Sequence, residues 1–378
     1  MSPAATRRFF LSALGTTGVL TALGSSPAHA RPDGHLRAAY LGSFGWTTPP
    51  GEGFEVACHD TLSGSLVPRR AVPGVPDASW LAFSPDGRVL YTTNELVPNG
   101  SVTALSLVDP HDPRPLNTRS TEGAGPTHLS VHPTGRFLLT ANYTDGTVVV
   151  HRLRQDGGIG ELTDLVQHTS TERPPRAHQV IVDPSGRWVV AVDLGADAVH
   201  TYRLNLANGT LHHNSQLSVA SGNGPRHLAF HPSGRHAYLV NELASTVTVL
   251  DWHAAAGVFT PGATLDTRPE GATGENYPAE VVVDRPGRTC YVTNRGDDTV
   301  AVFALSEHGA RLRLVDSVPT GGEWPRHCTL DPGQRWMYVA NQNSGTVTRL
   351  ARNTVTGKLG AVIDSAEVAG AAVLAFRP

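Results

Sequence analysis

The sequence predicts an all-β protein, a seven-bladed β-propeller, and three observations lead to that fold class. The 39 Gly and 28 Pro residues of the 378-residue chain are spread between short runs rich in Val, Leu, Tyr and Phe, as expected of many short strands joined by tight turns. One repeat unit is written six times. The two ends of the chain carry fragments of a seventh copy, so a ring of seven blades accounts for the sequence best.

Each repeat contains a strand, a Pro/Gly turn and a returning strand, followed by a Val/Thr-rich third strand, such as STVTVLDW at 245–252, and a weaker fourth strand. The turn position recurs roughly every 47 to 53 residues, and four antiparallel strands at such a period form a propeller blade. The six turn positions are Gly87, Gly135, Gly186, Gly234, Gly287 and Gln334.

The seventh blade is expected to combine both ends of the chain. The C-terminal AAVLAFRP (371–378) copies ASWLAFSP (78–85) and therefore predicts an innermost strand with no returning strand after it. LRAAYLGSF (36–44) resembles the returning strand and GFEVACHD (53–60) the third strand. Pairing the two ends closes the ring and removes exposed sheet edges. We therefore expect one propeller domain over residues 31–378.

Residues 1–30 have the features of a twin-arginine signal peptide. Arg7 and Arg8 precede an apolar stretch rich in Gly, Thr and Leu, and the sequence AHA ends at Ala30. A membrane anchor is the alternative, but the apolar run is shorter than the roughly 20 residues that span a bilayer. We expect export by the twin-arginine pathway to the periplasm, cell envelope or extracellular space, with no membrane attachment of the mature chain.

The composition of the chain limits the classes of molecule that it is expected to bind. A net charge of −3 and a pI near 6.6 provide no electrostatic surface for nucleic acid or an anionic membrane. The sequence lacks zinc-type spacing, a phosphate-binding Gly-rich loop and a GxSxG nucleophile, so we expect neither a metal nor a cofactor. Buried free thiols are expected for Cys58, Cys290 and Cys328, although export would permit one disulfide. For the oligomeric state, a monomer is the expectation.

Two columns of the repeat are explained by the blade itself. Side chains seven residues after the turn position should cap the turn into the third strand: Asn94, Asn142, Asp193, Asn241, Asn294 and Asn341. Side chains three residues before it should cap the Pro/Gly turn, which argues against metal binding by the two histidines: Ser84, His132, Asp183, His231, Asp284 and Asp331.

A third column contains bulky polar residues seven positions before the turn position. We expect these side chains to wedge between neighbouring blades, which would give His227 a structural role. The residues are Trp80, His128, Gln179, His227, Glu280 and His327.

Two further columns vary in chemistry from blade to blade and indicate a site. The first, eight residues before the turn position, contains His178, Arg226 and Arg326. The second, eight residues after it, contains Glu95, Tyr143, Glu242, Arg295 and Gln342. The start of one strand and the end of its hairpin partner meet at one end of a sheet, so Arg226 and Glu242 should be neighbours and both columns should converge on the central channel. Three arginines against two glutamates favour a small anionic ligand gripped by guanidiniums.

The chain resembles the propeller lactonases, the family of propeller-type 6-phosphogluconolactonases and carboxymuconate cyclases. PRAHQV, SGNGPRHLAFHPSGRHAYLVNEL, YVTNRGDDTVAVF and PRHCTLDP match the family's motifs in order, and the similarity spans residues 36–378. The resemblance implies a catalytic set of His178, Arg226, Glu242 and Arg295. VAGAAVLAF replaces the family's Gly-Pro and aromatic closing strand.

The resemblance implies hydrolysis of a sugar-acid or other anionic lactone. Water must lose a proton to Glu242 or His178, and Arg226 and Arg295 would stabilise charge on the carbonyl oxygen or a carboxylate. We expect Glu95, Tyr143, Arg326 and Gln342 to bind substrate. The export signal conflicts with the cytoplasmic location of 6-phosphogluconolactone. A lactonising cyclase or cycloisomerase and a non-catalytic exported binding protein are the alternatives.

Overall fold

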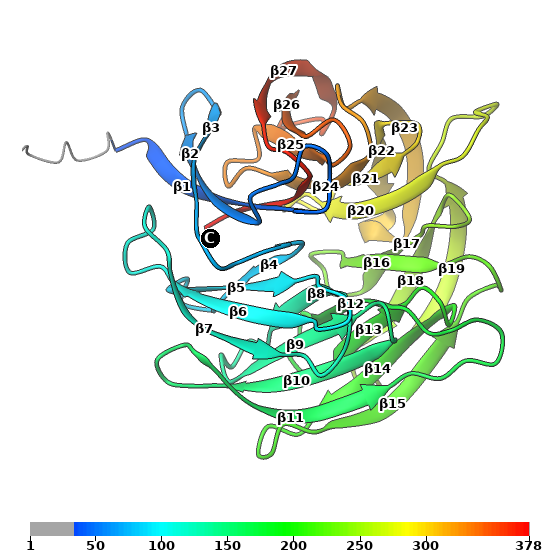
Figure 1. Cartoon of the computed structure of the whole chain (residues 1–378). Coiled ribbons are helices and arrows are strands. Elements are labelled where there is room, and N and C mark those ends of the chain that lie inside the picture. Colours follow the sequence, from blue (N-terminus) through cyan, green and yellow to red (C-terminus); the bar gives the residue numbers. More distant parts are fainter. Residues whose placement is uncertain (1–33, 378) are drawn as a thin grey trace, which may run out of the picture. The chain divides into compact units, whose positions relative to one another are not determined.

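The predicted ring of seven blades is confirmed. The computed structural model describes residues 34–377, in which seven four-stranded antiparallel sheets are formed. Each innermost strand contacts the innermost strand of the next blade, so the ring closes on itself (Figure 1). The expected signal peptide at 1–30 lies outside the described residues. Within the described part, no helix is long and apolar enough to cross a membrane.

The two chain ends share blade 1, as expected. Blade 1 contains, from the innermost strand outward, β28 (Ala371–Phe376), β1 (Leu36–Ser43), β2 (Phe54–Asp60) and β3 (Leu66–Ala71). Strand β28 pairs with β1 in the register Leu374↔Leu41 and Phe376↔Ala39. These hydrogen bonds join the last strand of the chain to the first described one, so the ring has no open blade.

The remaining six blades follow the chain in order. Blades 2 to 4 comprise β4 (Leu81–Phe83), β5 (Val89–Asn94), β6 (Ser101–Ser106) and β7 (Arg114–Ser120); β8 (Pro126–Val131), β9 (Phe137–Asn142), β10 (Thr147–Leu153) and β11 (Ile159–Gln167); and β12 (Ala177–Val182), β13 (Val189–Asp193), β14 (Ala198–Leu204) and β15 (Leu211–Ser218). Blades 5 to 7 comprise β16 (Pro225–Phe230), β17 (His236–Asn241), β18 (Thr246–His253) and β19 (Val258–Asp266); β20 (Tyr277–Val283), β21 (Thr289–Arg295), β22 (Thr299–Ser306) and β23 (Arg311–Pro319); and β24 (Pro325–Leu330), β25 (Trp336–Asn341), β26 (Thr346–Arg352) and β27 (Leu359–Glu367). A short 3₁₀ helix, η1 (Glu307–Gly309), precedes β23.

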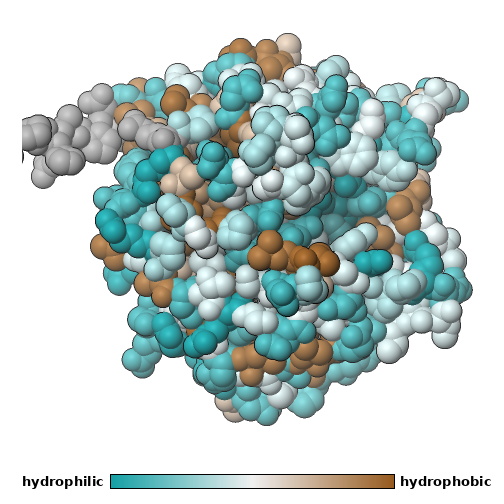
Figure 2. Space-filling view, in the orientation of Figure 1, coloured by the Kyte–Doolittle hydropathy of each residue, from teal (hydrophilic) through white to brown (hydrophobic). Residues whose placement is uncertain are grey.

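Apolar side chains between adjacent blades form the core. Tyr238 and Val240 of blade 5, for example, pack with Val281 and Val292 of blade 6. Tyrosines on the second strands add hydrogen bonds between blades. Tyr238 of blade 5, for example, donates a hydrogen bond to the Gly309 carbonyl oxygen of blade 6 at 2.8 Å. The blades are therefore held by buried apolar area and by satisfied polar groups between them. In the view of Figure 2, hydrophobic surface residues form small separate patches on a mostly hydrophilic surface.

The capping columns behave as predicted. Asn241 donates hydrogen bonds from Nδ2 to the hydroxyls of Thr246 and Thr248, both at 3.0 Å, and so ties the second strand to the third. His132 and His231 contact a hydroxyl of their own turn and a glycine carbonyl oxygen of the next blade. The three cysteines are free thiols and buried, as expected.

A register shift at the start of six of the seven innermost strands shapes the channel. In blade 5, Pro225 pairs with Asn241, but His227 pairs with Val240, which leaves Arg226 as the extra residue. The bulge interrupts the alternation of side chains, so consecutive residues Arg226 and His227 can both serve the channel side of the blade. The corresponding extra residues in blades 3, 4 and 7 are Thr127, His178 and Arg326.

Candidate functional site

Arg226 and Glu242 are neighbours, as the repeat predicted. Arg226 lies in the bulge of β16, and Glu242 directly follows β17, the hairpin partner of β16. Arg226 Nε lies 3.0 Å from Glu242 Oε2, and Arg226 Nη1 donates a 2.7 Å hydrogen bond to the Ala279 carbonyl oxygen of blade 6. Arg226 is only 1% exposed and is the largest of the described side chains that are fully buried. The propeller has thus placed a permanent charge deep in the protein.

A second guanidinium shares the same carboxylate oxygen. Arg295, the last residue of β21 in blade 6, places Nη2 2.6 Å from Glu242 Oε2. Its Nε donates to the Tyr277 carbonyl oxygen at 2.9 Å, and its guanidinium lies 5.3 Å from the centre of the Trp324 ring. One carboxylate therefore balances two guanidiniums, and this part of the channel carries surplus positive charge.

Each of the two guanidiniums has a nitrogen whose N–H is not aligned with a hydrogen-bond acceptor in the protein. Among the described residues, neither Arg226 Nε nor Arg295 Nη2 has an aligned hydrogen-bond acceptor, although each lies close to Glu242. Burial is the main reason that the pKa of Arg226 falls to about 9, and repulsion from Arg295 and Arg326 adds to it. Arg226 still carries its charge near neutral pH. Buried, charged donors without aligned acceptors suit an anionic group or an oxygen that gains negative charge.

His178 contributes a neutral imidazole from the bulge of β12. Its ring meets the Tyr143 ring edge to face at a centroid distance of 5.5 Å, and its Nδ1 is buried without a partner among the described residues. Burial, followed by the positive charge of Arg226, holds the pKa of His178 well below its usual value. His178 is therefore uncharged at neutral pH and has a ring nitrogen available for proton transfer.

Glu95 and Arg326 form a second ion pair, with Arg326 Nη2 3.3 Å from Glu95 Oε2. The Arg326 guanidinium lies 4.9 Å from the centre of the Phe44 ring of blade 1. Burial raises the pKa of Glu95, and the charge of Arg326 opposes that rise. Gln342 takes a different position, because it lines a side cavity between blades 7 and 1. Seven of the eight predicted residues thus belong to the channel groups just described, and Gln342 is the exception.

The wedge column contacts neighbouring blades, as predicted, and its members also converge across the channel. His128 and Gln179 accept hydrogen bonds from backbone N–H groups of the next blade, those of Val180 at 3.4 Å and Leu228 at 2.8 Å. These two side chains do link neighbouring blades. His227 and His327 contact Glu280 from the two blades that flank it, and the Trp80 ring meets the rings of His227 and His327 from a blade that neighbours neither of theirs.

His227 is the functional candidate that sequence reasoning missed. Its Nδ1 lies 3.3 Å from a carboxylate oxygen of Glu280, its Nε2 is buried without a partner among the described residues, and its ring centre is 5.0 Å from that of His178. The contact with Glu280 replaces the backbone link that His128 and Gln179 make, because Glu280 Oε1 itself accepts the Val281 N–H at 3.0 Å. The available signal in the sequence was the carboxylate of Glu280, in a column that also contains three histidines.

Glu280 also changes the charge count. Burial raises the pKa of this carboxyl group, whereas the neighbouring His327 and the positive charges of Arg226 and Arg326 oppose the rise. When ionised, Glu280 brings the channel to three guanidiniums and three carboxylates. Within residues 34–377, however, no group of three or more His, Cys, Asp or Glu side chains is placed to hold a metal ion.

The chain is similar to known proteins over most of its length. A family model described as "Lactonase, 7-bladed beta-propeller" matches residues 38–376. The chain belongs to this family. The 6-phosphogluconolactonase of Bacillus subtilis (strain 168) is 31% identical over 327 residues, which cover 85% of this chain and 93% of that protein. A 6-phosphogluconolactonase of Formosa agariphila is 27% identical over 335 residues, covering 85% of this chain and 94% of that protein.

Among solved structures, the periplasmic gluconolactonase of Pseudomonas aeruginosa is similar over the whole propeller. It is 30% identical with a TM-score of 0.86, covering 91% of this chain and 99% of that one. The predicted resemblance to propeller lactonases is thus confirmed.

Proposed function

We propose that this propeller lactonase hydrolyses the ring ester of a sugar-acid lactone at the Arg226–Glu242–Arg295 cluster. The observation that carries the proposal is the single Glu242 oxygen shared by two buried guanidiniums at 3.0 and 2.6 Å. A lactone has no full charge on its carbonyl oxygen, but that oxygen becomes negative when water adds to the carbon. Fixed guanidiniums stabilise this charge more than they stabilise the substrate, which is the requirement for catalysis.

His178 is the group we assign to proton transfer. It takes a proton from the attacking water, and the hydroxide oxygen forms a bond to the carbonyl carbon. The tetrahedral intermediate then breaks its bond to the ring oxygen, which receives the proton from the His178 imidazolium. The product is an open-chain hydroxy acid, and all atoms of the lactone and the water are retained in it.

Glu242 is better suited to positioning than to accepting this proton. Its Oε2 is occupied by two guanidiniums, and the pair of contacts fixes both arginines relative to each other across blades 5 and 6. His178, in contrast, is neutral and has a buried nitrogen without a partner among the described residues. Of the two bases that the sequence left open, this geometry favours His178.

We also propose that the protein is exported from the cytoplasm. Residues 1–30 have the sequence of a twin-arginine signal, and a periplasmic gluconolactonase is among the similar solved structures. We therefore place the domain at 31–378 outside the cytoplasm, where an unphosphorylated lactone is a more suitable substrate than a phosphorylated one.

A substrate panel tests the function. Purified mature protein is mixed separately with D-glucono-δ-lactone, 6-phosphogluconolactone and an unsaturated dicarboxylate, and acid release or ring formation is followed. Lactone hydrolysis well above the spontaneous rate is the expected result. Ring closure of the dicarboxylate without lactone hydrolysis would show a cyclase instead, and binding without turnover would show a non-catalytic protein.

A further inference from the structure

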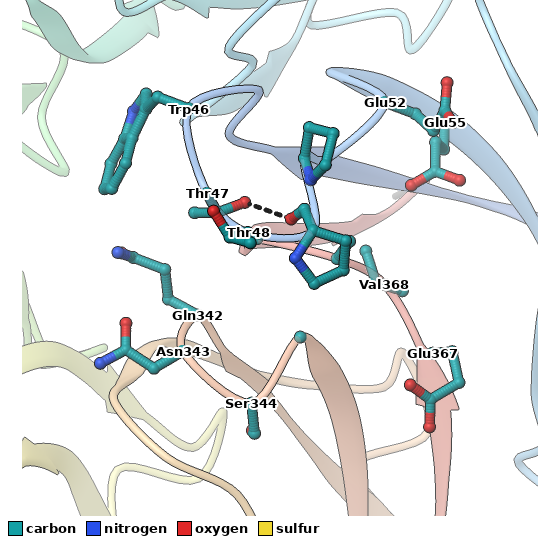
Figure 3. Close-up of a pocket in the computed structure, with 15 residues that line it drawn as sticks. Trp46, Thr47, Thr48, Glu52, Glu55, Gln342, Asn343, Ser344, Glu367 and Val368 are labelled. Atoms are coloured by element: carbon teal, nitrogen blue, oxygen red, sulfur yellow. Dashed lines mark hydrogen bonds between the residues drawn. The ribbon is translucent and has the colours of Figure 1, made fainter.

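A cavity of about 690 Å³ lies beside the channel, between blades 7 and 1. Its walls come from the loop between β1 and β2, from residues 342–345 after β25, and from residues 367–370 before β28 (Figure 3). This volume is within the range of small-molecule sites and is larger than one sugar ring needs. The cavity is separate from the Arg226–Glu242–Arg295 cluster, none of whose members lines it.

Gln342 gives this cavity a built polar wall. The residue is 7% exposed, and its Oε1 is buried without a hydrogen-bond partner among the described residues. Its backbone N–H donates to the Trp324 carbonyl oxygen at 3.0 Å, which fixes the chain at this point. A buried acceptor left unsatisfied is costly, so it calls for a donor such as a hydroxyl group in the cavity. In the repeat, Gln342 occupies the position that Glu242 and Arg295 occupy in their blades.

Trp46 supplies an apolar face on the same side of the cavity as the Gln342 amide (Figure 3). It is 65% exposed, unusually so for such a large ring, and it packs on Phe44 at a centroid distance of 4.9 Å. The loop that carries it is anchored, because the Thr47 hydroxyl lies within hydrogen-bond distance of the Phe44 and Pro49 carbonyl oxygens, 2.9 Å from each. Figure 3 shows Trp46 on the same side of the cavity as Gln342 and Asn343.

The combination of an aromatic face and side-chain amides matches the chemistry of a sugar. A pyranose ring presents an apolar C–H face, which an indole ring covers, and hydroxyls at its rim that both donate and accept hydrogen bonds. Asn343 and Ser344 add further donors and acceptors along the same wall.

The charge of the lining excludes an anionic occupant. Three carboxylates, Glu52, Glu55 and Glu367, lie on the side away from Trp46, and the lining residues include no Lys, Arg or His (Figure 3). Burial and the neighbouring Glu52 raise the pKa of Glu55, which is the effect expected where negative charge is crowded. A phosphate group would be repelled here, whereas a neutral sugar would not.

Phe44 links this cavity to the channel. One of its neighbours is Trp46 at the cavity, and the other is the Arg326 guanidinium of the Glu95–Arg326 pair, 4.9 Å from its ring centre. We infer that the cavity is a subsite for a neutral sugar, and that the enzyme's substrates include lactones of disaccharide-derived acids whose second, unoxidised sugar rests between Trp46 and Gln342. This inference rests on the proposed lactone hydrolysis.

The test compares three lactones and three variants. Values of kcat/KM are measured for cellobiono-δ-lactone, D-glucono-δ-lactone and 6-phosphogluconolactone with wild type, Trp46→Ala, Asn343→Ala and the control Val355→Ala. Val355 is 74% exposed and does not line the cavity. We expect a preference of about tenfold or more for cellobionolactone over gluconolactone. Trp46→Ala and Asn343→Ala should remove most of it and leave gluconolactone turnover within about twofold of wild type, and Val355→Ala should keep it.

Calorimetric titration with cellobiose, which cannot react, separates this inference from the proposed function. Binding that Trp46→Ala abolishes, with no lactone hydrolysed, would leave the sugar subsite standing and overturn lactone hydrolysis. Equal kcat/KM values for gluconolactone and cellobionolactone in both wild type and Trp46→Ala, with no binding of cellobiose, would overturn the subsite while leaving lactone hydrolysis standing. A preference for 6-phosphogluconolactone that persists in Trp46→Ala would also overturn it. Thermal melting of each variant checks that the exposed substitutions leave the fold unchanged.

Discussion

Arg295 Nη2 lies 2.6 Å from Glu242 Oε2, and this contact joins the end of the second strand of blade 6 to the corresponding position in blade 5. The side chain of Arg295 is only 7% exposed and that of Glu242 is 16% exposed. Because Glu242 also contacts Arg226, its charge stays compensated when Arg295 is removed. The same pair ties two blades together and positions a guanidinium in the channel.

Removal of the Arg295 guanidinium should impair catalysis much more than folding. Arg295→Ala is expected to lower kcat/KM for gluconolactone by about 100- to 1,000-fold, the usual effect of losing one donor that stabilises an oxyanion. Arg311→Ala in the same blade is the matched control, because its ion pair with Glu307 is exposed. Steady-state kinetics and thermal melting of both variants make the comparison. An Arg295→Ala enzyme with unchanged turnover would exclude the assigned role.

Glu242→Gln distinguishes a positioning carboxylate from a general base. The substitution keeps the shape but leaves two guanidiniums without their counterion, so the product anion gluconate should bind more tightly. We expect kcat to fall about tenfold and the inhibition constant for gluconate to fall as well, whereas His178→Gln should cost about 100-fold or more in kcat. The opposite ranking of the two variants, with weaker gluconate inhibition in Glu242→Gln, would make Glu242 the base.

We expect the free energy of unfolding to decrease in acid because of the buried histidines in the channel. Burial lowers the pKa of His128, His178, His227 and His327 in the folded protein. As the pH falls below about 6.5, the unfolded chain takes up protons on these residues and the folded chain does not, so the unfolded state is favoured by about 1.4 kcal/mol per pH unit for each uncompensated proton. Stability is thus fully present above about pH 6.5 and is lost below it.

Two carboxyl groups act in the opposite direction. Burial raises the pKa of Glu95 and Glu280, so the folded state holds their protons at pH values where the unfolded state has released them. Four imidazoles outnumber these two groups, and the free energy of unfolding should therefore fall between pH 7 and pH 5. Urea titrations at several pH values measure it. A free energy that is constant or rises over this interval would contradict the burial of four neutral imidazoles.

His200 should be replaceable with a gain in acid stability. It lies on β14, outside the channel, and its ring is tilted by 33° to that of His168 at a centroid distance of 4.1 Å. Neither of its ring nitrogens has a partner among the described residues. Burial is the main reason that its pKa falls to about 3. His200→Phe removes this group, and its effect on the unfolding free energy should be more favourable at pH 5 than at pH 8 by about 2 kcal/mol.

Urea titrations of His200→Phe at the two pH values provide the measurement. His212→Phe on the neighbouring strand β15 is the control at an exposed position, and we expect it to show no such pH-dependent gain. An equal effect of His200→Phe at pH 5 and pH 8 would show that His200 is not held neutral by burial.

The repeat made much of this structure predictable. Aligned copies within one chain identified the blades, the closing strand at 371–376 and the proximity of Arg226 and Glu242, because a four-stranded unit fixes which positions share a sheet end. The convergence of His227 and Glu280 was not predictable from the same columns. It depends on the bulge between Pro225 and His227, a register shift that changes which side chains face the channel without a clear mark in the sequence.

The Trp46 loop also escaped the sequence prediction, for a different reason. Residues between β1 and β2 lie outside the repeated unit, so no other copy in the chain could be compared with them. The prediction for Gln342 identified a polar position near the site, but only the structure shows that it lines a side cavity instead of joining the arginine cluster.

The most direct test of lactone hydrolysis at the Arg226–Glu242–Arg295 cluster is the initial rate of acid release from D-glucono-δ-lactone. The rate is measured above the spontaneous rate for the mature wild-type protein and for Arg226→Ala. Arg226 is buried and contacts Glu242, so thermal melting must accompany the rate, and Arg226→Lys serves as a second variant that retains the charge. The expected result is rapid hydrolysis by wild type and a loss of at least about 100-fold in Arg226→Ala. Hydrolysis that is equally fast in a folded Arg226→Ala protein would contradict it.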